Sequence, residues 1–159
     1  IAEFSKDMGC SSRTTLLVPN TIAEFDKVPN VDEYKNMLNR IDKSATLPQK
    51  RFSCGAGFGM SSIDPLGNVY PCHNMHYDIF KFGNIVHQGV EDIYSSEKVK
   101  TIRHNLHVDN IEQCKMCNIR YICGGGCRGA VYKLYKNEYA YPERLCQYYR
   151  AGIALQLDN

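Results

Sequence analysis

Three features of the sequence predict an α+β chain: apolar stripes at helical spacing, one β-hairpin pattern, and eight cysteines among 159 residues. A chain of this length forms one domain or two small ones and buries roughly 70% of its unfolded surface. In a chain without a signal segment, such thiol density is more typical of metal binding than of disulfides. We therefore expect a small cysteine-rich domain, with a β-hairpin and a few helices wrapped around metal sites.

Composition and charge argue against several classes of function. The net charge is only +2, and the basic residues are interspersed with acids, so nucleic acid is not an expected partner. No apolar stretch approaches the ~20 residues of a membrane helix, so a membrane is not expected either. The cysteine content favours the cytoplasm, and a disulfide scaffold is the third choice after iron and zinc. Because the first residue is Ile1 and not Met, we expect a fragment of a longer protein.

Two elements are predicted before residue 50. The β-branched and apolar run Thr14–Val18 ends at Pro19 and predicts a strand. Asn30 and Glu33 form the pattern of a capping box, which predicts a helix from about residue 31 to 42. Its apolar stripe consists of Tyr34, Met37, Leu38 and Ile41. The polar segment 43–51 is typical of a linker and indicates a domain boundary.

A β-hairpin is predicted over residues 60–72. Its arms are Met60–Ile63 and Val69–Cys72, and Asp64–Asn68 supplies the Pro and Gly of a tight turn. A hairpin brings its ends together, so Cys54 and Cys72, eighteen positions apart, should lie near one another. The glycines that follow Cys54 do not predict a phosphate loop, because that fingerprint must follow a strand and open a helix.

Short elements follow the hairpin. Phe82–Ile85 predicts a turn or a short strand, and Ser95 or Ser96 can cap a helix. That helix carries one apolar face made of Val99, Ile102 and Leu106. After Cys127, a second stripe predicts a helix to about residue 138, and Pro142 ends any continuation. The second stripe consists of Val131, Leu134 and Tyr135.

Four thiols lie within fourteen residues, at Cys114, Cys117, Cys123 and Cys127. The first two can hold one metal centre from a single turn. The glycine triplet before Cys127 lets backbone amides approach sulfur, because Gly lacks a side chain and reaches conformations closed to other residues. In two-cluster ferredoxins a similar run sends its last cysteine to the other cluster, and we expect the same division here. A single zinc tetrathiolate is the local alternative.

The full order of cysteines is more specific than any of its parts. Cys54 and Cys72 precede the run C-x2-C-x5-C-x3-C, and Cys146 follows it after eighteen residues. This order resembles the seven-cysteine SPASM domain. That domain is the C-terminal extension of radical S-adenosylmethionine enzymes that modify peptides and proteins, among them thioether-forming and anaerobic sulfatase-maturating enzymes. The resemblance covers residues 54–146. It implies that 51–159 form the SPASM domain and that 1–50 are the strand-helix tail of the preceding radical barrel and a helical linker.

The resemblance implies two auxiliary [4Fe-4S] clusters. The residues that match the ligands of the first cluster are Cys54, Cys72 and Cys127. Those that match the ligands of the second are Cys114, Cys117, Cys123 and Cys146. Fully ligated members carry one more cysteine just before the position of Cys54, and this chain has none there. The candidates for the open position are Cys10, a nearby side chain such as His73 or Ser53, and a substrate thiolate or solvent.

The family carries its catalytic cluster on a C-x3-C-x2-C motif, which this chain lacks. Cys123 and Cys127 begin that spacing, but Ala130 stands at the third position. The chain alone is therefore not expected to cleave S-adenosylmethionine, which belongs to the full-length enzyme. The resemblance implies electron transfer and docking of a peptide or protein substrate. The implied partners are the radical barrel of the same polypeptide and an electron donor such as ferredoxin or flavodoxin.

The alternative function is a structural zinc-binding module for protein contacts. It rests on the local C-x2-C pattern, and a protein prepared in air can carry zinc because thiolate sites accept both metals. The histidine pairs His73/His76 and His104/His107 also have a spacing compatible with metal, but imidazole is the second choice beside thiolates. Arg120 and Arg128 flank the cysteine run; they either offset the negative charge of a thiolate-bound cluster or are solvated.

Overall fold

The structure, a computed structural model, describes residues 7–8, 18–39 and 49–157. The predicted strand Thr14–Val18 lies outside the described residues except for Val18, which has no regular secondary structure, and Cys10 lies outside them as well. The chain divides into two compact units. The first combines Ile1–Pro48 with Glu143–Asn159, and the second is Gln49–Pro142. These structural units have different bounds from the domains expected from the family resemblance, 1–50 and 51–159, which stay a prediction.

The first unit contains the 3-10 helix η1 (Ile22–Lys27) and the helices α2 (Val31–Asn39) and α8 (Glu143–Leu157). The capping box that predicted α2 is confirmed. The Asn30 side chain accepts a hydrogen bond from the amide of Glu33 at 3.0 Å, and the Glu33 carboxylate accepts one from the amide of Asn30 at 2.8 Å. Residues 40–42, the predicted end of this helix, lie outside the described residues.

Helix α8 was not predicted, although it is the longest helix of the described chain with 15 residues. We interpreted Pro142 only as the end of a helix, whereas proline is equally suited to the start of one. The signal that could have found it is the buried stripe Leu145, Tyr148 and Ala151. Helix α8 packs against α2, and the Tyr148 hydroxyl donates to the carbonyl of Pro29 at 2.6 Å. The Tyr148 ring meets that of Tyr34 edge to face, with centroids 5.5 Å apart.

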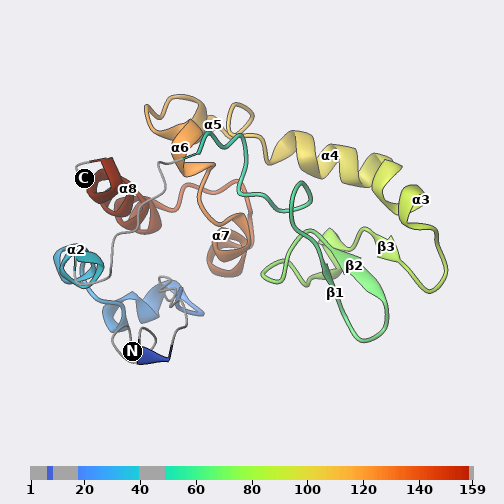
Figure 1. Cartoon of the computed structure of the whole chain (residues 1–159), viewed down its shortest axis with the longest axis horizontal. Coiled ribbons are helices and arrows are strands. Elements are labelled where there is room, and N and C mark those ends of the chain that lie inside the picture. Colours follow the sequence, from blue (N-terminus) through green and yellow to red (C-terminus); the bar gives the residue numbers. More distant parts are fainter. Residues whose placement is uncertain (1–6, 9–17, 40–48, 158–159) are drawn as a thin grey trace. The chain divides into compact units, whose positions relative to one another are not determined.

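The second unit contains one antiparallel sheet in the order β1-β2-β3 (Figure 1). The strands are β1 (Ser62–Ile63), β2 (Asn68–Tyr70) and β3 (Gly83–Asn84). Ile63 pairs with Val69, so the predicted hairpin is confirmed in place. The strands are shorter than the predicted arms at the ends away from the turn, where Pro71 has no amide to donate, and β2 begins one residue earlier than predicted, at Asn68.

The remaining elements of the second unit are short helices: η2 (Asp78–Phe80), α3 (Val90–Ser95), α4 (Glu97–Asn105), α5 (Glu112–Lys115), α6 (Arg120–Cys123) and α7 (Arg128–Tyr135). The predicted cap of α4 is confirmed, since the Ser96 hydroxyl accepts from the amide of Val99. Helix α3 was not predicted. Helix α7 ends three residues earlier than predicted, because Lys136 adopts a left-handed conformation with φ of 54°. No helix among the described residues is long and apolar enough to cross a membrane.

Two apolar clusters hold the second unit together. The first joins the sheet to α3 and α4 through Val69, Phe82, Ile93 and Val99. The second consists of Ala56, Cys72, Met75, Phe80 and Leu106, with Cys54 and Tyr132 packed against it. The second cluster therefore brings Cys54 and Cys72 together, as the hairpin predicted. It also buries the cysteine thiols in the same apolar surroundings as the core.

Gly152 offers a test of the packing between α2 and α8. A Cβ at this position would meet the Tyr34 hydroxyl at 3.6 Å and Leu38 at 3.7 Å, which is ordinary van der Waals contact. Because alanine has the higher helix propensity, Gly152→Ala should raise the free energy of unfolding by about 0.5–1 kcal/mol in urea titrations.

Gly129→Ala is the matched control, since it makes the same substitution in another helix. There a Cβ would lie 2.7 Å from the backbone oxygen of Asn74, so this variant should be destabilised. Equal effects of the two substitutions would contradict the described packing.

Candidate metal centre

Six of the seven cysteines predicted as ligands lie in the second unit, where they gather in two groups. The first thiol group is Cys54, Cys72 and Cys127, and the charge of each of the other two raises the pKa of Cys72. The second thiol group is Cys114, Cys117 and Cys123, and the charges of the first two raise the pKa of Cys123. The electrostatic contacts thus connect cysteines that are distant in sequence. They group Cys127 with Cys54 and Cys72 and not with the thiols that precede it in the run.

Two further cysteines predicted as ligands, Cys146 and Cys10, are not among these six. Cys146 lies on α8, in the first unit, and Cys10 lies outside the described residues. Their role as ligands stays a prediction. Among the described residues, no three His, Cys, Asp or Glu side chains converge in a way that could hold a single metal ion.

Local structure positions the first thiol group. Cys72 lies two residues after the end of β2, and Cys54 precedes the bridge between Ala56 and Met60. Cys127 is the N-cap of α7, where its sulfur accepts a hydrogen bond from the amide of Ala130 at 3.4 Å. Each thiol therefore lies where a regular element begins or ends, which leaves backbone amides free to point at sulfur.

Backbone amides donate to most of these sulfurs. Cys54 accepts hydrogen bonds from the amides of Ala56 and Arg128, and these lower its pKa. Cys72 is approached in the same way by the amides of Asn74 and Met75. The Asn74 side chain adds a donor to Cys127 Sγ at 3.6 Å. Such hydrogen bonds stabilise the thiolate form and tune the properties of a bound metal. Asn74 was missed from the sequence, because its contact depends on tertiary structure alone.

The glycine triplet serves the second thiol group. Gly124, Gly125 and Gly126 all have positive φ, at 67°, 83° and 67°. This conformation turns the amides of Gly125 and Gly126 toward the sulfur of Cys123, where they lower its pKa. A Cβ on Gly125 would lie 4.0 Å from Cys114 Sγ. The close approach of amides that the sequence predicted is therefore confirmed at Cys123.

Burial opposes these hydrogen bonds. Burial, together with a smaller contribution from the Cys54 and Cys127 charges, raises the pKa of the Cys72 thiol to about 11. Burial is also the main cause of the raised pKa of Cys54, Cys114 and Cys123. These thiols are consequently protonated at neutral pH, and a metal must displace their protons to bind. A donor set made of sulfur alone suits soft metal centres, so the residues fit iron-sulfur clusters and zinc alike.

The other candidates for ligands have different surroundings. The Ser53 hydroxyl accepts a hydrogen bond from the amide of Gly55 at 3.1 Å, and His73 is exposed. The His76 ring stacks on Tyr70 with centroids 4.3 Å apart. His107 stacks on Phe52, with centroids 5.5 Å apart.

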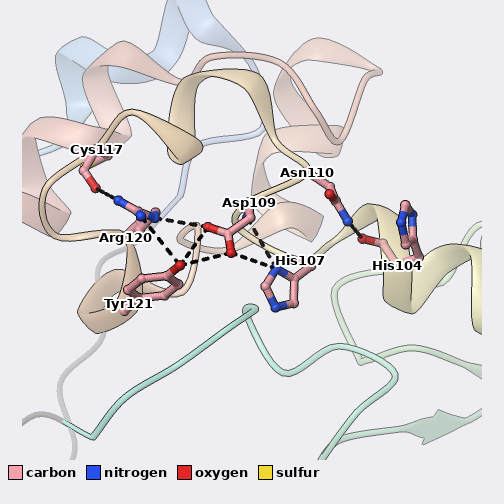
Figure 2. A network of polar contacts seen from close by, with 7 residues as sticks. All are labelled: His104, His107, Asp109, Asn110, Cys117, Arg120 and Tyr121. Atoms are coloured by element: carbon pink, nitrogen blue, oxygen red, sulfur yellow. Dashed lines mark hydrogen bonds and ion pairs between the residues drawn. The ribbon is translucent and has the colours of Figure 1, made fainter.

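A polar network surrounds the loop that carries Cys117 (Figure 2). Arg120 Nε lies 3.0 Å from Asp109 Oδ1, and its Nη1 donates to the carbonyl of Cys117 at 3.2 Å. The Tyr121 hydroxyl donates to the same carboxylate, and His107 Nδ1 lies 3.7 Å from it. The charge of Arg120 is therefore matched by Asp109, which the sequence did not indicate.

Gly124 tests the role of the triplet. A Cβ there would lie 2.5 Å from the backbone oxygen of Ser53, at a residue with positive φ. Gly124→Ala should therefore lower the free energy of unfolding by about 1–3 kcal/mol in urea titrations of the metal-free chain. Gly59→Ala is the control, because a Cβ at Gly59 meets nothing within 4 Å. A Gly124 variant as stable as this control would contradict the described turn.

The raised pKa of Cys72 predicts its reactivity. Only the thiolate is alkylated, so the rate at Cys72 in the folded, metal-free chain should rise tenfold per pH unit from pH 8 to pH 10. In urea the same cysteine should level off above its ordinary pKa of about 8.5. Peptide mapping by mass spectrometry measures both rates. A plateau near pH 9 in the folded chain would show that burial does not raise this pKa.

Comparison with known proteins bears on these thiol groups. Residues 54–118 match the SPASM family, described as an iron-sulfur cluster-binding domain. The mycofactocin maturase MftC of Mycolicibacterium smegmatis is 33% identical over 78 residues, covering 48% of this chain and 19% of that protein. The antilisterial bacteriocin subtilosin biosynthesis protein AlbA of Bacillus subtilis is 30% identical over 97 residues, covering 60% of this chain and 21% of that protein.

A solved structure, native anSMEcpe with bound AdoMet, aligns with 79% of this chain and 33% of its own. Its sequence identity is 19% and its TM-score is 0.43. The chain spans about a fifth of the length of the two curated relatives. The match covers Cys54, Cys72, Cys114 and Cys117, which are thiols of both groups. Residues 54–118 thus match the SPASM family of iron-sulfur cluster-binding domains, which confirms the resemblance predicted from the order of the cysteines.

Proposed function

We propose that the chain is the auxiliary-cluster domain of a radical S-adenosylmethionine enzyme that modifies a peptide or protein. It holds two [4Fe-4S] clusters, which supply one-electron transfer, and it helps to dock the substrate. The observation that carries this proposal is the division of six thiols into two groups of three, each drawn from its own segments of the second unit. One group would serve each cluster.

The ligands follow from the two groups. Cys54, Cys72 and Cys127 would hold the first cluster. Cys114, Cys117 and Cys123 would hold the second, with Cys146 as the fourth ligand that the order of the family assigns. The amides that donate to Cys54, Cys72 and Cys123 support this assignment, because hydrogen bonds to sulfur stabilise the thiolate charge that a cluster requires.

The first thiol group has three members among the described residues, so the fourth ligand of its cluster is not assigned. Cys10 and a substrate thiolate are the main candidates. The Ser53 hydroxyl already accepts a hydrogen bond from Gly55, which makes it the weaker choice. An open position would let a cysteine of the substrate peptide bind directly, whereas ligation by Cys10 would restrict the site to electron transfer or structure.

The partners belong to the same proposal. The radical barrel would precede the chain in the same polypeptide and supply S-adenosylmethionine cleavage, since the C-x3-C-x2-C motif is lacking here. The names of the relatives, a mycofactocin maturase and a bacteriocin biosynthesis protein, support a peptide as the substrate. A ferredoxin or flavodoxin would supply electrons in the cytoplasm.

Metal analysis of anaerobically prepared protein tests the proposal. The wild-type chain should contain about eight irons and about eight acid-labile sulfides, with the visible absorption of [4Fe-4S] clusters. Cys127→Ser and Cys117→Ser should each remove about half of the iron, because each change affects one thiol group. Serine at position 127 can still accept from the amide of Ala130 and cap α7, so this loss would not reflect unfolding.

The variant Cys10→Ala separates the candidates for the fourth position. Loss of the first cluster would make Cys10 a ligand, and full iron content would leave the position to substrate or solvent. A colourless protein that resists reconstitution and holds one or two zinc ions would instead support the structural zinc-binding module. In that case the electron-transfer function would be wrong.

A further inference from the structure

Arg128 is the most deeply buried charged residue of the described chain, with 1% of its surface exposed. It directly follows Cys127 and begins α7. Its Nη1 donates to the carbonyl of Glu138 at 3.1 Å and to that of Ala140 at 3.5 Å. Its Nε is buried and has no hydrogen-bond acceptor among the described residues. The guanidinium thus retains an unused donor inside the protein.

The charge of Arg128 also lacks a counterpart. A guanidinium stays protonated in proteins, and neutral carbonyls do not cancel its charge. No carboxylate among the described residues forms an ion pair with it. A buried charge is costly unless it is paired, so this arrangement calls for a negative partner that the described residues do not supply.

The position of Arg128 relates it to both thiol groups. Its backbone amide donates to the sulfur of Cys54, in the first group. Its side-chain charge acts on Cys54 and also on Cys114, in the second group, where burial raises the pKa of both thiols and the charge of Arg128 opposes part of that rise. One cation therefore lies within electrostatic reach of a thiol from each group. Gly129 keeps the start of α7 close to Asn74, whose side chain donates to Cys127.

We propose that Arg128 is the shared counter-cation of the two thiolate sites. Two loaded sites carry the negative charge that the buried guanidinium lacks, and their sulfur atoms are acceptors of the kind that its Nε lacks. This inference rests on the proposed function, because it assumes that both thiol groups bind an anionic centre. It goes further by assigning the electrostatic link between the two sites to one side chain.

Arg120 does not have this role, although it lies within the cysteine run. Its side chain is 29% exposed, and its Nε lies 3.0 Å from the Asp109 carboxylate. Removal of the Arg120 charge would leave Asp109 near the surface and would change little in the interior. The two arginines therefore form a matched pair: one is buried without a carboxylate partner, and the other is partly exposed and paired.

A shared counter-cation has a consequence for reduction. Each cluster gains one electron when it is reduced, so its negative charge grows, and a nearby cation favours that reduced form. Loss of the cation should therefore lower both reduction potentials together. A purely structural arginine, which only fixes the carbonyls of Glu138 and Ala140 to α7, would change iron content or stability without shifting both potentials.

The test is a redox titration of the reconstituted chain with dithionite as the one-electron donor, followed by absorption and electron paramagnetic resonance. Arg128→Met should lower the equilibrium constant for reduction of each cluster about tenfold, which is ~59 mV per one-electron step. Arg128→Lys keeps the charge and should keep both constants within about threefold of the wild type. Arg120→Met, the matched control, should leave both unchanged. A shift of one cluster only, or of neither, would overturn the inference.

The outcomes separate this inference from the function on which it rests. A wild-type chain without two reduction transitions would overturn the proposed function and the inference with it. Two transitions in the wild type, with no joint shift in folded Arg128→Met, would overturn the inference alone. If Arg128→Met does not fold, Arg128→Lys is the deciding variant. Two preserved reduction potentials support the shared cation, and a tenfold change in the equilibrium constant for reduction of one or both clusters contradicts it.

Discussion

The second unit depends on a conflict between the burial of thiols and their ionisation. Cys72 is almost completely buried, and burial raises its pKa to about 11, yet a metal binds only the thiolate. Hydrogen bonds from the amides of Asn74 and Met75 act against that rise at Cys72, and the positive charge of Arg128 acts against the corresponding rise at Cys54 and Cys114. Around the thiols, backbone N–H groups and the Arg128 guanidinium thus direct positive charge toward sulfur.

This constraint explains why the cysteines lie at the ends of short elements. Inside a helix or a sheet the amides are already paired, and only at the ends are they free to donate to side chains. Cys127 caps α7, Cys72 follows β2, and Cys123 is followed by three glycines in left-handed conformations. The small size of these elements is therefore a consequence of the site. Longer helices would consume the amides that the sulfur atoms require.

The two arginines near the cysteine run show how burial decides the role of a charge. Arg120 is partly exposed and lies against Asp109, so its field is largely cancelled before it reaches the thiols. Arg128 is buried without a carboxylate partner in the described chain, and its field acts on a thiol of each group. The same residue type, eight positions apart in sequence, thus has a local structural role in one case and an electrostatic role at both sites in the other.

The sequence by itself determined the local features: the capping box at Asn30, the hairpin that brings Cys54 to Cys72, and the glycine triplet beside Cys123. These features depend on the conformational preferences of neighbouring residues. It also indicated the family, because the order of seven cysteines is specific. Helix α8 was missed, because Pro142 was interpreted as the end of a helix although the stripe Leu145, Tyr148 and Ala151 follows it in the sequence. Only the tertiary structure decided that Asn74 donates to Cys127 and that Arg128 is buried beside both thiol groups while Arg120 is paired. Burial and charge pairing arise between residues far apart in the chain, and no local pattern encodes them.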